Sequence, residues 1–195
     1  MESLFNTNFL RKVLTEIAET NSSRTGGGGG GGGSGSCSRR RCRVVVHVGS
    51  VESWPESLNR GDRCGGGGGG VGDDDDDDDD AVMIFNNEHA SQLGEHWLAV
   101  RVDGERRRAS IFDSMPVVPF PNEILRKLGE VCDEIINTNE AIVQDPFLPL
   151  CGLYCLTFLE HKLRGAPLAL RGENTTRNDL YVLSCMWPYI CKLFD

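Results

Sequence analysis

The chain has 195 residues, the length of a single domain, and a formal net charge of −9. The run from Asp73 to Asp80 supplies eight negative charges, so the rest of the chain is nearly neutral and a strongly anionic surface is excluded. Charged residues interrupt the first 19 residues, where a signal peptide has an apolar core, and no later stretch approaches 18 apolar residues. We therefore expect one folded domain over residues 1–195 that contacts no membrane.

Eight cysteines would suit a disulfide framework in a small secreted protein, but nothing in this sequence indicates secretion. The thiols are therefore expected to be mostly free, in an intracellular and reducing setting. Zinc is not favoured either, because the chain has only four histidines and its neighbouring cysteines lack the CxxC spacing of zinc ligands. These neighbouring pairs are Cys37/Cys42, Cys151/Cys155 and Cys185/Cys191.

Two low-complexity segments are unsuited to a packed core. Residues 26–36 contain only glycine and serine, and residues 65–80 join a glycine run to the aspartate run. Such compositions behave as flexible chain, because they offer no apolar surface to bury. We interpret both segments as insertions or linkers within the domain.

The first half of the chain predicts a helix followed by strands. Apolar residues at three- and four-residue steps predict an amphipathic helix over about 3–19. Short apolar, β-branched runs predict strands at 43–48 and 81–85. An alternating segment at 96–102, an Asp-Gly step and an apolar run at 109–112 predict a hairpin.

The second half predicts three helices. Residues 121–137 begin with proline and carry apolar residues at helical spacing. Residues 150–163 are apolar on nearly every side, which is typical of a central helix buried by its neighbours. Residues 178–194 predict a last helix, broken or kinked at Pro188. Together the elements predict an α+β fold with antiparallel strands in the middle and a buried central helix.

The hairpin places a histidine and an acid together. If the turn centres near Gly104, His96 lies opposite Ile111 or Asp113. Either register puts Asp113 on the same face as His96, close enough for a carboxylate to orient the imidazole and favour its protonated form. The other histidines compete poorly, because His161 lies ten residues beyond Cys151 on the central helix, and His47 and His89 have no evident carboxylate partner.

A cysteine lies at the start of the central helix. Cys151 follows Leu150 there, where unpaired backbone N–H groups and the helix dipole favour a thiolate. Gln144, seven residues earlier, carries an amide that could face an oxyanion beside the Cys151 N–H. Cys155, one turn deeper, is interpreted as a core residue.

Each of these residues also has an ordinary interpretation. Taken alone, Cys151 suits a small core residue, and His96 suits a histidine at a strand end that is satisfied by water. Asp113 alone suits a turn cap with Ser114, and Gln144 alone suits a loop position. The argument for a site therefore depends on the four residues together.

The strings GEHWLAV, IFDSM and QDPFLPLCGLYCLTFL resemble the cysteine proteases of adenoviruses and of adenovirus-like genes in large virus-related DNA transposons. The resemblance covers most of residues 43–185, apart from the glycine and aspartate runs. It implies a single protease domain of the adenovirus type, within the wider superfamily that removes ubiquitin-like modifiers. It also implies that His96 is the base, Asp113 the acid, Gln144 the oxyanion donor and Cys151 the nucleophile. Trp97 and Gly152 would contact substrate, and Trp97 would restrict the site to small residues such as glycine.

The resemblance implies a protein substrate, namely a viral or element-encoded precursor, and a setting in the host nucleus, the cytoplasm or the virion. No cofactor is expected to be required, although adenovirus proteases are stimulated by DNA and by a disulfide-linked peptide. Cys132 lies roughly where that peptide would attach, but it also fits the apolar stripe of its predicted helix. Basic clusters at 38–43 and 106–108 would allow weak nucleic-acid binding, although exposed loop arginines explain them as well. The alternatives are a modifier deconjugase of the same fold and an inactive, protease-like binding module.

Overall fold

The computed structural model describes residues 6–24, 44–50, 52–58, 80–87, 96–117, 119–172 and 174–192. The insertion predicted at 26–36 and most of the one at 65–80 lie outside these ranges, as do the basic cluster at 38–43 and His89. Each of these predictions therefore stays a prediction.

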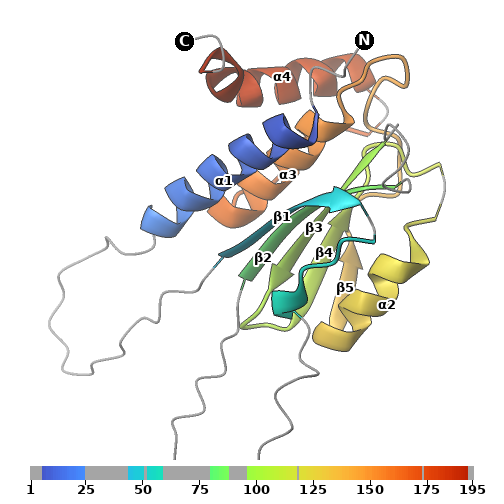
Figure 1. The fold of residues 1–195 in the computed structure, drawn as a ribbon. Coiled ribbons are helices and arrows are strands. Elements are labelled where there is room, and N and C mark those ends of the chain that lie inside the picture. Colours follow the sequence, from blue (N-terminus) through green and yellow to red (C-terminus); the bar gives the residue numbers. More distant parts are fainter. Residues whose placement is uncertain are drawn as a thin grey trace, which may run out of the picture.

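A five-stranded sheet forms the centre of the described fold, in the order β1-β2-β3-β4-β5 (Figure 1). The strands are β1 (Val44–Ser50), β2 (Asp80–Asn86), β3 (Trp97–Asp103), β4 (Arg108–Phe112) and β5 (Glu134–Asn137). The pair β3–β4 is antiparallel, as the hairpin predicts, and β2–β3 is antiparallel too, whereas β1–β2 and β4–β5 are parallel. The α+β class with antiparallel central strands is thus confirmed, and the parallel edges are an addition to it.

Within the described residues, four α-helices and one short 3₁₀ helix accompany the sheet. They are α1 (Thr7–Arg24), η1 (Glu56–Leu58), α2 (Asn122–Val131), α3 (Cys151–Arg164) and α4 (Thr175–Cys191). Helices α1 and α3 lie side by side on one face of the sheet, α4 crosses their ends, and α2 lies on the opposite face (Figure 1). No helix in the described part of the chain combines the length and apolar composition that crossing a membrane requires.

The sheet is apolar on both faces because helices cover both. Along β2, Val82 and Ile84 point into the core shared with α1, α3 and α4. The alternate residues Met83 and Phe85 point into a second core against α2. This two-residue alternation is the geometry of any strand, and burial on both faces explains why β2 reads as a continuous apolar run.

Helix α3 is the central element. Its residues from Cys151 to Glu160 are buried, which agrees with the sequence prediction of a helix covered on all sides. The helix ends at Gly165, whose φ of 63° is left-handed and places its N–H on the carbonyl of Lys162. Glycine adopts this conformation without the steric cost that a side chain would add.

The predicted helix at 121–137 is wrong in its second half. Helix α2 ends at Val131, Cys132 is extended, and Glu134–Asn137 forms β5. Ile135 and Ile136 pair with Ala109 and Ser110 of β4. Both isoleucines also fit the helical stripe, so the pairing with β4, a tertiary interaction, decides their conformation.

Candidate active site

The hairpin register differs from the sequence prediction, yet it keeps the predicted face. Val100 pairs with Ile111 and Ala99 with Phe112, and the turn occupies residues 104–107 rather than centring on Gly104. Continued outward, this register places Met115 opposite His96, so Asp113 is a diagonal neighbour rather than a direct partner. Because strand side chains alternate, a shift by two residues leaves Asp113 on the same face.

His96 immediately precedes β3, and Asp113 immediately follows β4. The Nε2 atom of His96 lies 2.5 Å from Oδ1 of Asp113, and the exposed fractions are 8% for His96 and 5% for Asp113. The same carboxylate oxygen accepts the backbone N–H of Met115 at 2.7 Å. The imidazole is therefore held by a buried carboxylate that is itself fixed to the backbone.

The other ring nitrogen of His96, Nδ1, has a different environment. Nδ1 is buried and has no hydrogen-bond partner among the described groups. Cys151 is the first residue of α3, 7% exposed, and close enough to His96 for its thiol to raise the pKa of the imidazole. With Nε2 bound to Asp113, Nδ1 is the ring nitrogen that stays available.

The pKa of His96 reflects opposed effects. Burial acts to lower it, whereas the hydrogen bond and the negative charge of Asp113, together with the neighbouring Cys151, raise the pKa to about 9. The charged imidazolium is therefore favoured at neutral pH. A thiolate at a helix N-terminus beside an imidazolium is the reactive pair of thiol proteases.

Gln144 is fully buried, with an exposed fraction of 0%. Its Oε1 accepts the hydroxyl of Ser114 at 2.8 Å, and its Nε2 donates to the carbonyl of Leu148 at 2.5 Å. One amide hydrogen thus stays uncommitted, but the surrounding chain covers it. Because the side chain is fully buried, an incoming substrate oxygen reaches this amide only if neighbouring residues move.

Two polar residues without a predicted role connect the histidine pair to Gln144. Ser114, which follows Asp113, binds Gln144 through its hydroxyl and Val143 N–H through its carbonyl. Asn139 donates to the backbone carbonyl of Asp113 at 2.5 Å. The segment after β5 is therefore hydrogen-bonded to residues 111–114, and these bonds fix the position of Gln144 relative to Asp113. The adjacency of Ser114 to Asp113 is the only signal of this in the sequence.

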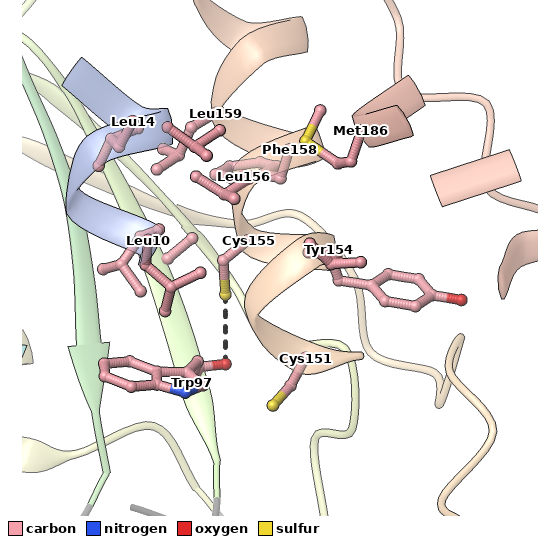
Figure 2. Close-up of a cluster of buried hydrophobic side chains, with 14 of the residues drawn as sticks. Leu10, Leu14, Trp97, Cys151, Tyr154, Cys155, Leu156, Phe158, Leu159 and Met186 are labelled. Carbon is pink, nitrogen blue, oxygen red and sulfur yellow. Dashed lines mark hydrogen bonds between the residues drawn. The ribbon is translucent and has the colours of Figure 1, made fainter. Parts of the chain in front are cut away.

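Cys155 has a structural environment, as the sequence predicts. Burial is the main cause that raises its pKa well above the ordinary value, and the charges of Cys151 and Asp113 add to it. Its thiol donates to the carbonyl of Trp97 at 3.3 Å. Figure 2 shows this bond, with the Cys151 sulfur one turn earlier pointing away from the helix. Trp97 itself is 8% exposed and belongs to the core that includes Leu10, so its contact with substrate stays a prediction.

Gly152 lies where α3 approaches α1. A Cβ at this position would stand 2.9 Å from Cδ2 of the buried Leu10. Close helix packing thus accounts for a glycine here, and its predicted role as a substrate contact stays a prediction.

We expect Gly152→Ala to lower the free energy of unfolding by about 1–2 kcal/mol, because an added methyl group must displace Leu10 in a packed core. Gly129→Ala is the matched control, since nothing lies within 4 Å of its Cβ. That change should stabilise α2 by about 0.5–1 kcal/mol through backbone entropy. Urea denaturation measures both, and a shift of the same sign in the two variants would refute the packing explanation.

The other described histidines do not form a comparable pair. Nε2 of His161 lies 2.8 Å from the hydroxyl of Tyr181, and Nε2 of His47 lies 3.3 Å from that of Ser53. Within the described ranges, His96 is the histidine that forms an ion pair with a carboxylate. The structure thus places His96 beside a carboxylate, and its role as a catalytic base stays a prediction.

The described positions suggested for binding an activating peptide or DNA are buried or paired within the fold. Cys132 is 5% exposed just beyond α2, and burial raises its pKa to about 11, with Arg107 opposing and Asp133 adding to the shift. The three arginines of the 106–108 cluster each form an ion pair: Arg106 with Asp103, Arg107 with Asp133 and Arg108 with Glu134. A phosphate would have to compete with these carboxylates. Among the described side chains, no group of three or more His, Cys, Asp or Glu is placed to hold a metal ion.

No protein-family model matches this chain, and no curated protein sequence matches it. Among solved structures, the fold is similar to ChlaDub1 from Chlamydia trachomatis, with a TM-score of 0.39 and 18% sequence identity. The similarity covers 56% of this chain and 62% of ChlaDub1, less than two thirds of that protein. Similarity at this level identifies no family, so the site geometry carries the functional argument.

Proposed function

We propose that this chain is a cysteine endopeptidase of the adenovirus-protease type that cleaves precursor proteins. The observation that carries the proposal is the environment of His96. Its Nε2 is bound to Asp113, Cys151 raises the pKa of its imidazole, and its Nδ1 has no hydrogen-bond partner among the described groups. The sequence resemblance assigns the same residues to the same roles.

In the proposed reaction, the Cys151 thiolate attacks the scissile carbonyl carbon. A C–S bond forms, and the carbonyl electron pair moves to oxygen. The His96 imidazolium then gives its Nδ1 proton to the leaving amine as the C–N bond breaks. The neutral imidazole next takes a proton from water, which attacks the thioester and releases the acid product and the thiolate. Asp113 would hold the ring throughout, which leaves Nδ1 for the proton transfers.

The oxyanion would be bound by two donors. The backbone N–H of Cys151 lies at the start of α3, where helix geometry leaves it without an acceptor inside the helix. The second donor is the amide of Gln144, once the chain near Leu148 makes room. We infer that the chain around Leu148 adjusts when substrate binds.

The proposed substrate specificity comes from the resemblance to adenovirus proteases. Trp97, which follows the proposed base, and Gly152, which follows the proposed nucleophile, would contact the substrate, and Trp97 would favour small residues such as glycine at the cleaved bond. All four proposed catalytic groups belong to this chain, so catalysis does not require a cofactor. Stimulation by DNA or by a peptide is not needed to explain the geometry.

A cleavage profile of a peptide library tests the proposal. The purified chain should cut internal bonds after small residues, and Cys151→Ser should cut none. A suicide probe built on a ubiquitin-like modifier separates the alternatives: efficient reaction would indicate a deconjugase and contradict precursor processing. If the wild-type chain neither cleaves the library nor reacts with the probe, the chain is a binding module and the proposal is wrong.

A further inference from the structure

The backbone on both sides of Gln144 is held by polar side chains from two helices. They are Tyr154 of α3 and Asn178 and Asp179 of α4, which we call the Gln144 clamp. All three are buried, with exposed fractions of 1%, 1% and 4%. None of them has a role predicted from the sequence.

The clamp bonds to the residues flanking Gln144. The Tyr154 hydroxyl lies 2.9 Å from the carbonyl oxygen of Val143 and 2.7 Å from Oδ1 of Asp179, so it shares its hydrogen between them. Nδ2 of Asn178 donates to the same Val143 carbonyl at 2.9 Å. On the other side of Gln144, the N–H of Asp145 donates to Oδ1 of Asp179 at 3.5 Å.

The surrounding contacts make this arrangement rigid. The N–H of Val143 donates to the carbonyl of Ser114 at 3.0 Å, so both backbone groups of Val143 are bound. Oδ1 of Asn178 accepts the N–H of Arg171 at 2.9 Å, which fixes the amide orientation. Gln144 is therefore attached to the sheet side through Ser114 and to the helices through the clamp.

Stability alone does not explain the clamp. Oδ2 of Asp179 is buried and has no hydrogen-bond partner in the part of the chain that the structure describes. A buried polar oxygen without a partner lowers stability relative to a well-packed apolar group. Polar groups kept at such a cost are typical of sites where geometry matters for function.

We propose that Tyr154, Asn178 and Asp179 are positioning residues for the oxyanion donor Gln144. They fix the backbone at Val143 and Asp145, so that the Gln144 amide keeps its place while the chain near Leu148 moves for substrate. This inference rests on the proposed peptidase function. It adds that α4, remote in sequence from the catalytic motif, helps form the oxyanion site.

Two reactions of Cys151 separate this role from general structural support. Alkylation by iodoacetamide requires the thiolate and His96, but no oxyanion forms in that reaction. Amide hydrolysis requires the thiolate and His96 and also forms an oxyanion that must be stabilised. Tyr154→Phe should therefore lower kcat for peptide hydrolysis on the order of tenfold or more, with KM little changed and the alkylation rate unchanged. Asn178→Asp, which places a second acceptor against the Val143 carbonyl, should show the same split.

Tyr181→Phe is the matched control, because it removes a phenolic hydroxyl of α4 that contacts His161 instead of the Gln144 backbone. It should keep both rates, and circular dichroism establishes that each variant is folded. Equal losses of alkylation and hydrolysis in Tyr154→Phe, or no loss of hydrolysis, would overturn the positioning role. A wild-type chain that shows neither selective alkylation nor hydrolysis would instead overturn the proposed function on which the role depends.

Discussion

His96→Ala will remove nearly all peptidase activity, with kcat/KM lower on the order of 10⁴-fold or more. The reason is that Nδ1 of His96 is the proposed proton acceptor and donor for Cys151, and its imidazolium supports the thiolate. Alkylation of Cys151 near pH 6.5 should fall on the order of 10²-fold, to the rate of an ordinary thiol. Initial hydrolysis rates and mass spectrometry of the labelled peptide measure the two effects.

His161→Ala is the control for this substitution. His161 is also a histidine within the helical layer, but it contacts Tyr181 and has no carboxylate partner among the described residues. Its replacement should leave both rates near those of the wild type. Retention of more than a tenth of the wild-type activity in His96→Ala would contradict the assigned base.

Asp113→Asn will lower kcat by about 10² to 10⁴-fold and shift the alkaline limb of the pH profile downward. In the wild type, burial lowers the pKa of His96, but the hydrogen bond and charge of Asp113 and the neighbouring Cys151 outweigh it and raise the pKa from 6.5 to about 9. Activity that depends on the imidazolium should therefore persist to about pH 9. Without the Asp113 charge the pKa of His96 falls, so the activity is lost at lower pH.

The same pKa predicts a stability effect with a definite sign. Because the folded-state pKa of His96 is raised, its contribution to stability is complete below pH 6.5 and is lost as the pH rises through about 9. Asp113→Asn should flatten this decline in the free energy of unfolding. Asp133→Asn, which removes a carboxylate from the surface pair with Arg107, is the control and should keep the wild-type profile. If Asp113→Asn left the alkaline limb of the activity profile unchanged, the proposed role of Asp113 would be contradicted.

The sequence predicted the elements whose apolar pattern is unambiguous. Helix α3 and the strands around the hairpin lie close to their expected bounds because burial imposes the periodicity that the sequence displays. Strand β5 was missed, since Ile135 and Ile136 satisfy a helical stripe and a parallel strand equally well. Only pairing with β4, formed by residues more than 20 positions earlier, distinguishes the two.

The histidine and acid of the site could be predicted because local hairpin geometry brings them together. The exact register was wrong, but His96 and Asp113 stay on one face under any shift of two residues. Gln144 was predicted only by its spacing from Cys151. Its contacts with Ser114 and Leu148, and the clamp from Tyr154 and α4, join separate segments, and single residues in a sequence carry no signal of such contacts.

The central claim is that Cys151 is a nucleophile activated by His96, and site-resolved alkylation tests it most directly. The native chain is treated with limiting iodoacetamide at pH 6.5, and modification of each cysteine is followed by mass spectrometry. Cys151 should react on the order of tenfold or more faster than Cys191, although Cys191 is the less buried of the two. A rate for Cys151 equal to or below that of Cys191 would contradict the claim.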